Sequence, residues 1–134
     1  MRVIDADAHV IECERTWTYV ERAALARMPR LVTEVDGDGA KQYWVLEGRA
    51  HGRTNVGLAT TSRESRELAD VDARVRHMDE LEIDVQVLYP SLFLRPLTRR
   101  PDVEILLSQS YNRWLADVWP RVGDACAGPR SFPL

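Results

Sequence analysis

The sequence predicts an α/β fold in which helices connect parallel strands. Three observations carry this prediction. An apolar stretch interrupted by Asp5 and Asp7 opens the chain, and a near-continuous apolar run at residues 85–89 is typical of a strand buried on both faces. Between and after these runs, apolar residues recur at the spacing of amphipathic helices. With 134 residues, 45% of them apolar, we expect one domain with a sizeable core.

The N-terminal part is expected to contain one strand and one helix. Residues 2–8 make up the apolar run and are predicted to form the first strand. Trp17 and Val20 begin a repeat of apolar residues at three- and four-residue spacing, which predicts a helix over residues 16–28. Pro29 follows directly and is expected to end this helix.

Residues 31–47 are expected to form a β-hairpin. The segments 31–35 and 42–47 are rich in residues that favour strands, and they flank an Asp-Gly-Asp-Gly sequence at residues 36–39. Asp-Gly pairs between two such segments are typical of a tight turn. Residues 48–66 carry Gly, Arg, Ser and Thr with little periodicity, so a loop is predicted there.

The second half of the chain is expected to add a helix, a strand and a further helix. Residues 68–82 carry an apolar stripe at helical spacing. The strand at residues 85–89 comes next and is closed by Pro90. The last helix is predicted over residues 101–119, because a proline occupies its first position and Pro120 follows its end.

Composition excludes several classes of function. The chain has 18 basic and 21 acidic residues, a net charge of -3, which argues against a nucleic-acid-binding protein. Cys13 and Cys126 match no metal or redox spacing, which favours a reducing compartment. No signal segment and no apolar run of membrane-spanning length is present, so no membrane association is expected. The sequence predicts a cytoplasmic protein.

The residues with the clearest chemical meaning lie at the end of the first strand. Asp7 and His9 are two positions apart, so on a strand their side chains point to the same side, and Glu12 follows shortly after. A carboxylate and a neutral imidazole are suitable ligands for zinc or a similar divalent ion. In the alternative interpretation, Asp7 caps the following segment and His9 is an interior histidine with its own hydrogen-bond partners.

The other polar groups carry weaker indications. Arg95 clusters with Arg99 and Arg100 beyond the second strand, which makes Arg95 a candidate for binding a substrate carboxylate; a solvated loop end is the alternative. His51 lies in the Gly- and Arg-rich loop and is expected to be exposed to solvent. His77 is expected on the outer face of a helix, beside an acidic residue three positions later.

Three blocks of the sequence resemble one enzyme family. They are IDADAHVIE at residues 4–12, VDARVRHMDELEID followed by VQVLYP at residues 71–90, and YNRWLAD at residues 111–117. In this order they are similar to the amidohydrolase-related (amidohydrolase 2) metalloenzymes, in the branch that contains the aminocarboxymuconate-semialdehyde and hydroxybenzoate decarboxylases. The resemblance covers nearly the whole chain, and residues 31–66 contribute least to it.

The resemblance implies a fold and a metal site. Residues 1–134 would form the N-terminal part of one (β/α)₈ TIM barrel of the metal-dependent hydrolase type, with a hairpin insert at about residues 31–47. A single divalent metal, zinc or manganese, would be bound by Asp7 and His9. Glu12 matches the trailing acid of the motif, either as a third ligand or as a support for the other two. The implied reaction is decarboxylation or hydrolysis of a small carboxylated substrate.

The chain departs from this family in its length. Family members are much longer and take a further histidine and an aspartate from later strands, whereas after Trp119 this sequence has no histidine and only one acid, Asp124. No strand pattern is apparent in this tail. We therefore expect a truncated chain with an incomplete ligand set. The alternative is a catalytically inactive remnant or an interaction module, and self-association into a homo-oligomer is left open.

Overall fold

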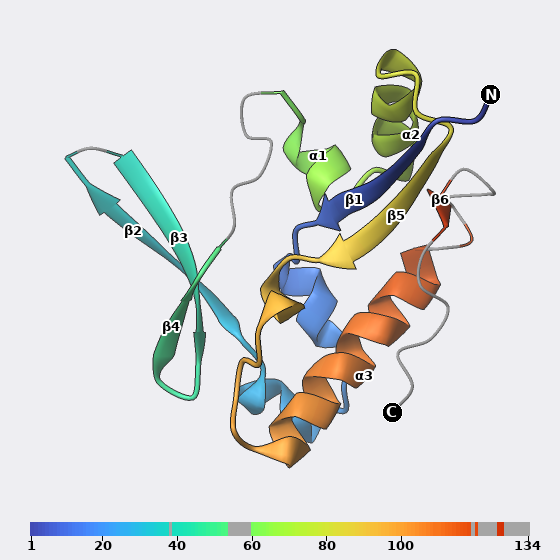
Figure 1. Cartoon of the computed structure of the whole chain (residues 1–134). Coiled ribbons are helices and arrows are strands. Elements are labelled where there is room, and N and C mark those ends of the chain that lie inside the picture. Colours follow the sequence, from blue (N-terminus) through green and yellow to red (C-terminus); the bar gives the residue numbers. More distant parts are fainter. Residues whose placement is uncertain (38, 54–59, 119, 121–125, 128–134) are drawn as a thin grey trace. The chain divides into compact units, whose positions relative to one another are not determined.

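A computed structural model describes residues 1–37, 39–53, 60–118, 120 and 126–127. Its contacts divide the chain into two compact units. The first unit comprises Met1–Ile11, Asn55–Ser91 and Val118–Leu134, and the second comprises Glu12–Thr54 and Leu92–Asp117. The protein is mixed α/β, as predicted, and its described residues form two three-stranded sheets without a closed barrel (Figure 1).

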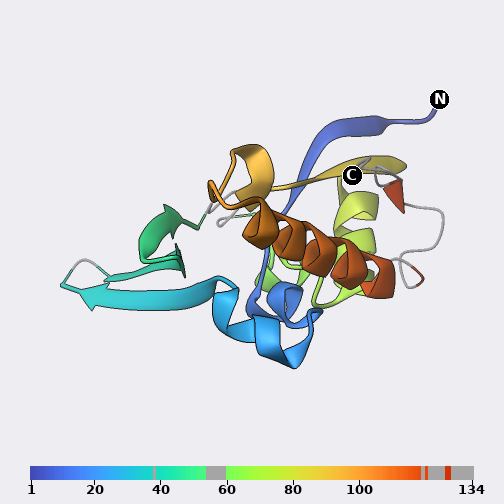
Figure 2. The same cartoon turned by 90° about the horizontal axis from the view of Figure 1, so that it is seen from below.

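The sheet of the first unit contains β1 (Ile4–Val10), β5 (Val85–Pro90) and β6 (Cys126–Ala127), in that order. Both strand pairs are parallel, which confirms the predicted arrangement, and Figures 1 and 2 both show β1 and β5 side by side. The first strand begins and ends two residues later than predicted, because its pairing with β5 runs from Ile4 to Val10. The expectation that no strand follows Trp119 is wrong, since β6 pairs with β5.

Burial along β5 corrects a second expectation. Gln86, Leu88 and Pro90 are buried, whereas the alternate residues are half-buried or, at Tyr89, exposed. The strand is therefore buried on one face and more open on the other. A strand buried on both faces was predicted because four of the five residues at positions 85–89 are apolar. An apolar run does not by itself supply a second layer of packing partners.

The helices of the first unit are α1 (Arg63–Arg66) and α2 (Val71–Glu80). The second lies inside the predicted range 68–82 and starts where the Asp70 carboxylate accepts the Ala73 N–H at 3.2 Å. The loop predicted over residues 48–66 is wrong at both ends. Its end forms α1, because the Ser62 hydroxyl accepts the Ser65 N–H; residues 54–59 lie outside the described part.

The second unit contains an antiparallel sheet of β2 (Arg30–Asp36), β3 (Gly39–Leu46) and β4 (Arg49–Gly52). The pair β2–β3 confirms the predicted hairpin. The strand β4 replaces the first part of the predicted loop, and it pairs with β3 through a two-residue turn at Glu47 and Gly48. Both turn residues have positive φ, 50° and 75°, the backbone conformation that a tight hairpin of this kind requires.

The helix expected over residues 16–28 is instead two 3₁₀ helices, η1 (Glu14–Thr18) and η2 (Arg22–Arg27). The reason lies in Ser110 on α3 (Pro101–Val118). Its hydroxyl donates to the Thr16 carbonyl at 2.7 Å and accepts the Tyr19 N–H at 3.3 Å. These two backbone groups would otherwise take part in α-helical bonds, so the side chain of Ser110 interrupts the helix.

The last helix, α3, agrees with the prediction up to residue 118, and Trp119 lies outside the described residues. The short 3₁₀ helix η3 (Leu92–Leu94) precedes it in the chain. Trp114 on α3 is 1% exposed and therefore buried. The core of the second unit is built on Trp17 and Trp44, whose rings meet edge to face with centroids 6.0 Å apart. It also contains Met28, Leu46, Leu97, Val103 and Leu107.

Candidate functional site

A β-bulge shapes the end of β1. Asp5 pairs with Gln86 and Ala8 pairs with Leu88, so three steps along β1 correspond to two along β5. The extra residue changes the alternation of side chains. Ala8 is 5% exposed and faces the buried side of the sheet. Asp7 and His9, on either side of Ala8, therefore share the opposite and more open face.

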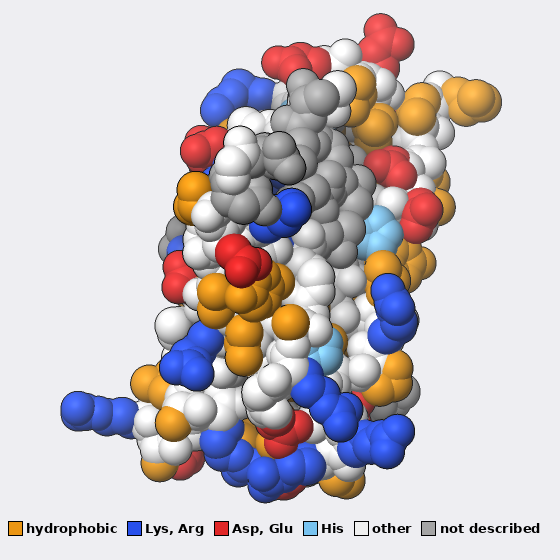
Figure 3. All heavy atoms as spheres, turned by 90° about the vertical axis from the view of Figure 1, so that its left-hand side faces the viewer, with side chains coloured by type: hydrophobic (Ala, Val, Ile, Leu, Met, Phe, Trp, Pro, Cys, Tyr) orange, Lys and Arg blue, Asp and Glu red, His pale blue; other side chains and the backbone are white. Residues whose placement is uncertain are grey.

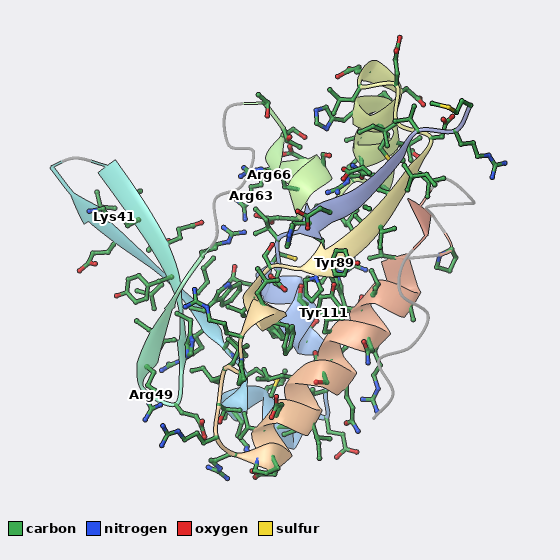
Figure 4. All side chains as sticks on the ribbon, viewed as in Figure 1. Lys41, Arg49, Arg63, Arg66, Tyr89 and Tyr111 are labelled. Carbon is green, nitrogen blue, oxygen red and sulfur yellow. The ribbon has the colours of Figure 1, made fainter. Side chains whose placement is uncertain are left out.

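Asp7 and His9 lie close to each other, as predicted. The His9 Nε2 and Asp7 Oδ1 atoms are 3.6 Å apart, and the two side chains are 19% and 93% exposed respectively. Among the described residues, His9 Nδ1 is buried and has no hydrogen-bond partner. The imidazole lies beside Tyr89, with ring centroids 6.3 Å apart, and Figure 4 shows Tyr89 at the end of β5. The alternative of a fully hydrogen-bonded interior histidine therefore does not describe His9.

A chain of hydrogen bonds, buried at Arg74 and Gln86 and exposed at Asp7, leads to this pair. Arg74 Nε donates to Gln86 Oε1 at 2.9 Å, and Gln86 Nε2 donates to Asp5 Oδ2 at 3.0 Å. Asp5 Oδ1 accepts the Asp7 N–H at 3.1 Å, and Arg74 Nη1 donates to the His9 carbonyl at 3.1 Å. The network thus binds the backbone of both candidate ligands and links β1 to β5 and α2.

Sequence reasoning did not identify Arg74 and Gln86 as part of the site. A signal was present in the sequence, because both polar residues interrupt apolar patterns: Arg74 lies on the apolar stripe of a helix, and Gln86 lies in the apolar run at residues 85–89. They are 6% and 7% exposed. A polar side chain that is buried in this way needs hydrogen-bond partners, and here the partners belong to the strand that carries Asp7 and His9.

Glu12 belongs to the second unit and has a backbone partner. Its side chain is almost fully buried, at 1% exposure, and both carboxylate oxygens lie 3.0 Å from the Leu92 nitrogen, which donates to them. Burial, together with the negative charge of Glu12, raises the pKa of Tyr111 well above its ordinary value. The geometry thus gives Glu12 a role in holding the segment after β5, whereas Asp7 and His9 face each other in the first unit.

The remaining predicted residues lie apart in the fold. His51 is half-buried on β4 opposite Trp44, so its expected exposure is only partial. His77 is half-buried in the last turn of α2. Arg95 is exposed in the segment between η3 and α3. Within the described ranges, no group of three or more His, Cys, Asp or Glu side chains is arranged to hold a metal ion.

Comparison of the chain with protein-family models, with curated proteins and with solved structures finds no match. The resemblance to the amidohydrolase-related enzymes therefore depends on the three sequence blocks alone. In the part of the chain that the structure describes, no helix has the length and apolar character needed to cross a membrane.

Proposed function

We propose that this chain carries the first-strand part of an amidohydrolase-related metal site, in which Asp7 and His9 bind one divalent ion, zinc or manganese. The observation that supports this most is the pairing of an imidazole and a carboxylate, 3.6 Å apart, at the carboxyl end of a parallel strand. Carboxylate and imidazole together suit zinc and similar ions.

The strand order supports a barrel of the (β/α)₈ type. The parallel strands β1, β5 and β6 neighbour one another in the order in which they occur in the chain. Helical segments lie between β1 and β5, and α3 lies between β5 and β6. Consecutive βα units in sequential order build such barrels, whose reactions take place at the carboxyl ends of the strands. Each half of a doubly wound sheet has the same sequential order, so the choice of a barrel follows from the resemblance.

The proposed chemistry is hydrolysis or decarboxylation of a small carboxylated substrate. When bound, the metal would supply Lewis acidity and a template that orients the substrate. The residues of this chain would hold that ion through Asp7 and His9. Arg74, Gln86 and Asp5 would keep the backbone of the two ligands in place through the bonds described above. Substrate class and reaction follow from the resemblance, and Arg95 remains the proposed contact for a substrate carboxylate.

Metal titration of the purified chain tests this proposal. Zinc and manganese are each titrated against a competing chelator, with the wild type compared with His9→Gln, Asp7→Asn and the control His77→Gln. Loss of an outer support weakens metal binding about 10–100-fold in known sites, so loss of a ligand should weaken it at least about tenfold. His77→Gln should bind as the wild type does. Equal affinity in His9→Gln and the wild type would contradict the proposed site.

A second candidate function is an interaction module without catalysis. Two observations favour it: the described residues bring two candidate ligands together rather than three, and the first unit exposes large apolar side chains. Val3, Ile4 and Tyr89 are 46%, 59% and 38% exposed. Size-exclusion chromatography combined with thermal unfolding separates the candidates. Self-association or binding to a partner supports the module, whereas a stable monomer with one cooperative transition argues against it.

A further inference from the structure

The strand β2 forms an open edge of the sheet in the second unit. The strand order is β2–β3–β4, so among the described residues β2 has a strand partner on one side only, and in Figure 2 the cyan β2 lies along the border of this sheet. The opposite edge strand, β4, has four residues, whereas β2 has seven and pairs with β3 without a bulge. Proteins usually protect an exposed edge with a short or bulged strand. A long and regular edge such as β2 is therefore available for pairing with another strand.

Every second residue of β2 points its backbone N–H and C=O groups away from the sheet. The pair Leu46–Arg49 closes the two-residue β3–β4 turn and is hydrogen-bonded, as in turns of this type. Hydrogen bonding alternates along an antiparallel strand, so the even-numbered residues of β2 bond to β3. Leu31, Thr33 and Val35 consequently point their backbone groups outward. In the described part of the chain, no hydrogen bond to these outward groups is found.

Opposite charges lie at two exposed positions of this strand. Arg30 and Glu34 are both exposed, and because they are four positions apart they point to the same face of the sheet, with Val32 between them. Among the described residues, neither charge has a hydrogen-bond or ion-pair partner. Figure 3 faces the side on which Figure 1 draws β2–β4, and it shows acidic, basic and apolar side chains together at the surface. Both charges of β2 are thus accessible to a partner.

We propose that two copies of the chain associate by antiparallel pairing of β2 with β2 of the second copy. A two-fold axis at Val32 places Arg30 of each copy opposite Glu34 of the other, and Leu31 opposite Thr33. The outward backbone groups of Leu31 and Thr33 then exchange hydrogen bonds across the interface. Opposite charges directly across an antiparallel pair are stabilising, and this pair occurs twice. The two three-stranded sheets become one continuous sheet.

The charges and the backbone select this register. A shift of one residue would bring the outward backbone groups of one copy opposite residues whose groups already bond to β3, and it would turn the side chains to the other face. A shift of two residues would place Val32 opposite Arg30 in one direction and opposite Glu34 in the other. In the second case Arg30 would lie opposite position 36, but Glu34 would still lack a charged partner. Only the axis at Val32 matches both charges of residues 30–34.

The partner is a second copy because the strand is complementary to itself. Each copy supplies one basic and one acidic residue at positions that the two-fold axis exchanges. The interface comprises residues 30–34 of each copy, and interfaces well below the standard size are weak. We therefore expect a dimer that forms at high protein concentration. The proposal uses neither Asp7 nor His9, so metal-free protein can test it independently of the proposed metal site.

Analytical ultracentrifugation of the full chain with a chelator present, from about 1 μM to about 1 mM, provides the test. Arg30→Glu and Glu34→Arg each replace two opposite-charge pairs by two like-charge pairs, so each should raise the dissociation constant at least about tenfold. An equimolar mixture of these two variants restores opposite charges across the interface and should dimerise as the wild type does. Arg22→Glu is the matched control, because Arg22 is an exposed arginine on η2 outside the sheet. It should leave the dissociation constant within about twofold of the wild type.

The mixture also checks that both variants fold, since an unfolded chain cannot supply the edge strand. A wild type that stays monomeric up to about 1 mM would overturn the proposal. A dimer that neither Arg30→Glu nor Glu34→Arg weakens would assign self-association to another surface, such as the exposed apolar residues of the first unit. Equal losses in Arg30→Glu and Arg22→Glu, or a mixture that does not dimerise, would contradict the register and the proposal with it.

Discussion

Buried polar side chains decide where the candidate ligands of this chain point. Arg74 is almost fully buried, yet it donates hydrogen bonds to Gln86 and to the backbone of His9. Without these partners a buried guanidinium would be strongly unfavourable. The same bonds fix the bulge of β1, because Gln86 in turn holds Asp5, whose carboxylate accepts the Asp7 N–H. The positions of Asp7 and His9 thus depend on Arg74 and Gln86, which are far from them in the sequence.

Substitution of Arg74 tests this network. Arg74→Leu removes the guanidinium and leaves Gln86 and the His9 carbonyl without their donor, so the free energy of unfolding should fall by about 3 kcal/mol. Arg76→Leu is the control on the same helix, since the Arg76 side chain is 65% exposed and lies 3.6 Å from Asp70. It should change stability by less than about 0.5 kcal/mol. Urea denaturation measures both values, and similar losses in the two variants would refute the network.

At the scale of elements, sequence periodicity located most segments but not their hydrogen bonds. The repeat that begins at Trp17 predicted one helix over residues 16–28; Trp17 and Met28 do enter the core, but the segment between them forms two 3₁₀ helices. It did not show that Ser110, about 90 positions later, would bond to Thr16 and Tyr19 and divide the segment into η1 and η2. Such long-range bonds are invisible to local spacing, and so is the bulge of β1, which depends on its register with β5.

The division of this segment gives a second stability prediction. Ser110→Ala removes the acceptor of the Tyr19 N–H and the donor to the Thr16 carbonyl, so two backbone groups lose their partner. Ser110 is fully buried, and the free energy of unfolding should fall by about 1–3 kcal/mol.

Ser108→Ala is the matched control for this experiment. Ser108 lies on the same helix and is half-buried, and its loss should leave stability within about 0.5 kcal/mol of the wild type. Chemical denaturation, followed by tryptophan fluorescence from the Trp17 and Trp44 cluster, compares the two variants. A Ser110→Ala protein as stable as the control would mean that the two 3₁₀ helices form without the serine.

For the whole molecule, the sequence predicted the α/β class, the parallel pairing of β1 with β5 and the proximity of Asp7 to His9. It could not assign Glu12, whose partner is the Leu92 amide 80 positions later. It also grouped Arg100 with Arg95, whereas the fold brings Arg100 together with Arg27 and Arg30 around a pocket. Local patterns specify strands and helices well, but the chemistry of a side chain depends on what the fold places beside it.

The central claim is that Asp7 and His9 together bind a divalent metal. The most direct measurement is the zinc X-ray absorption spectrum of the chain after titration with zinc, recorded for the wild type, His9→Gln and His77→Gln. Our account predicts imidazole scattering in the wild type and in His77→Gln, and its loss in His9→Gln. A spectrum without imidazole scattering in the wild type, or one that His9→Gln leaves unchanged, would contradict the claim.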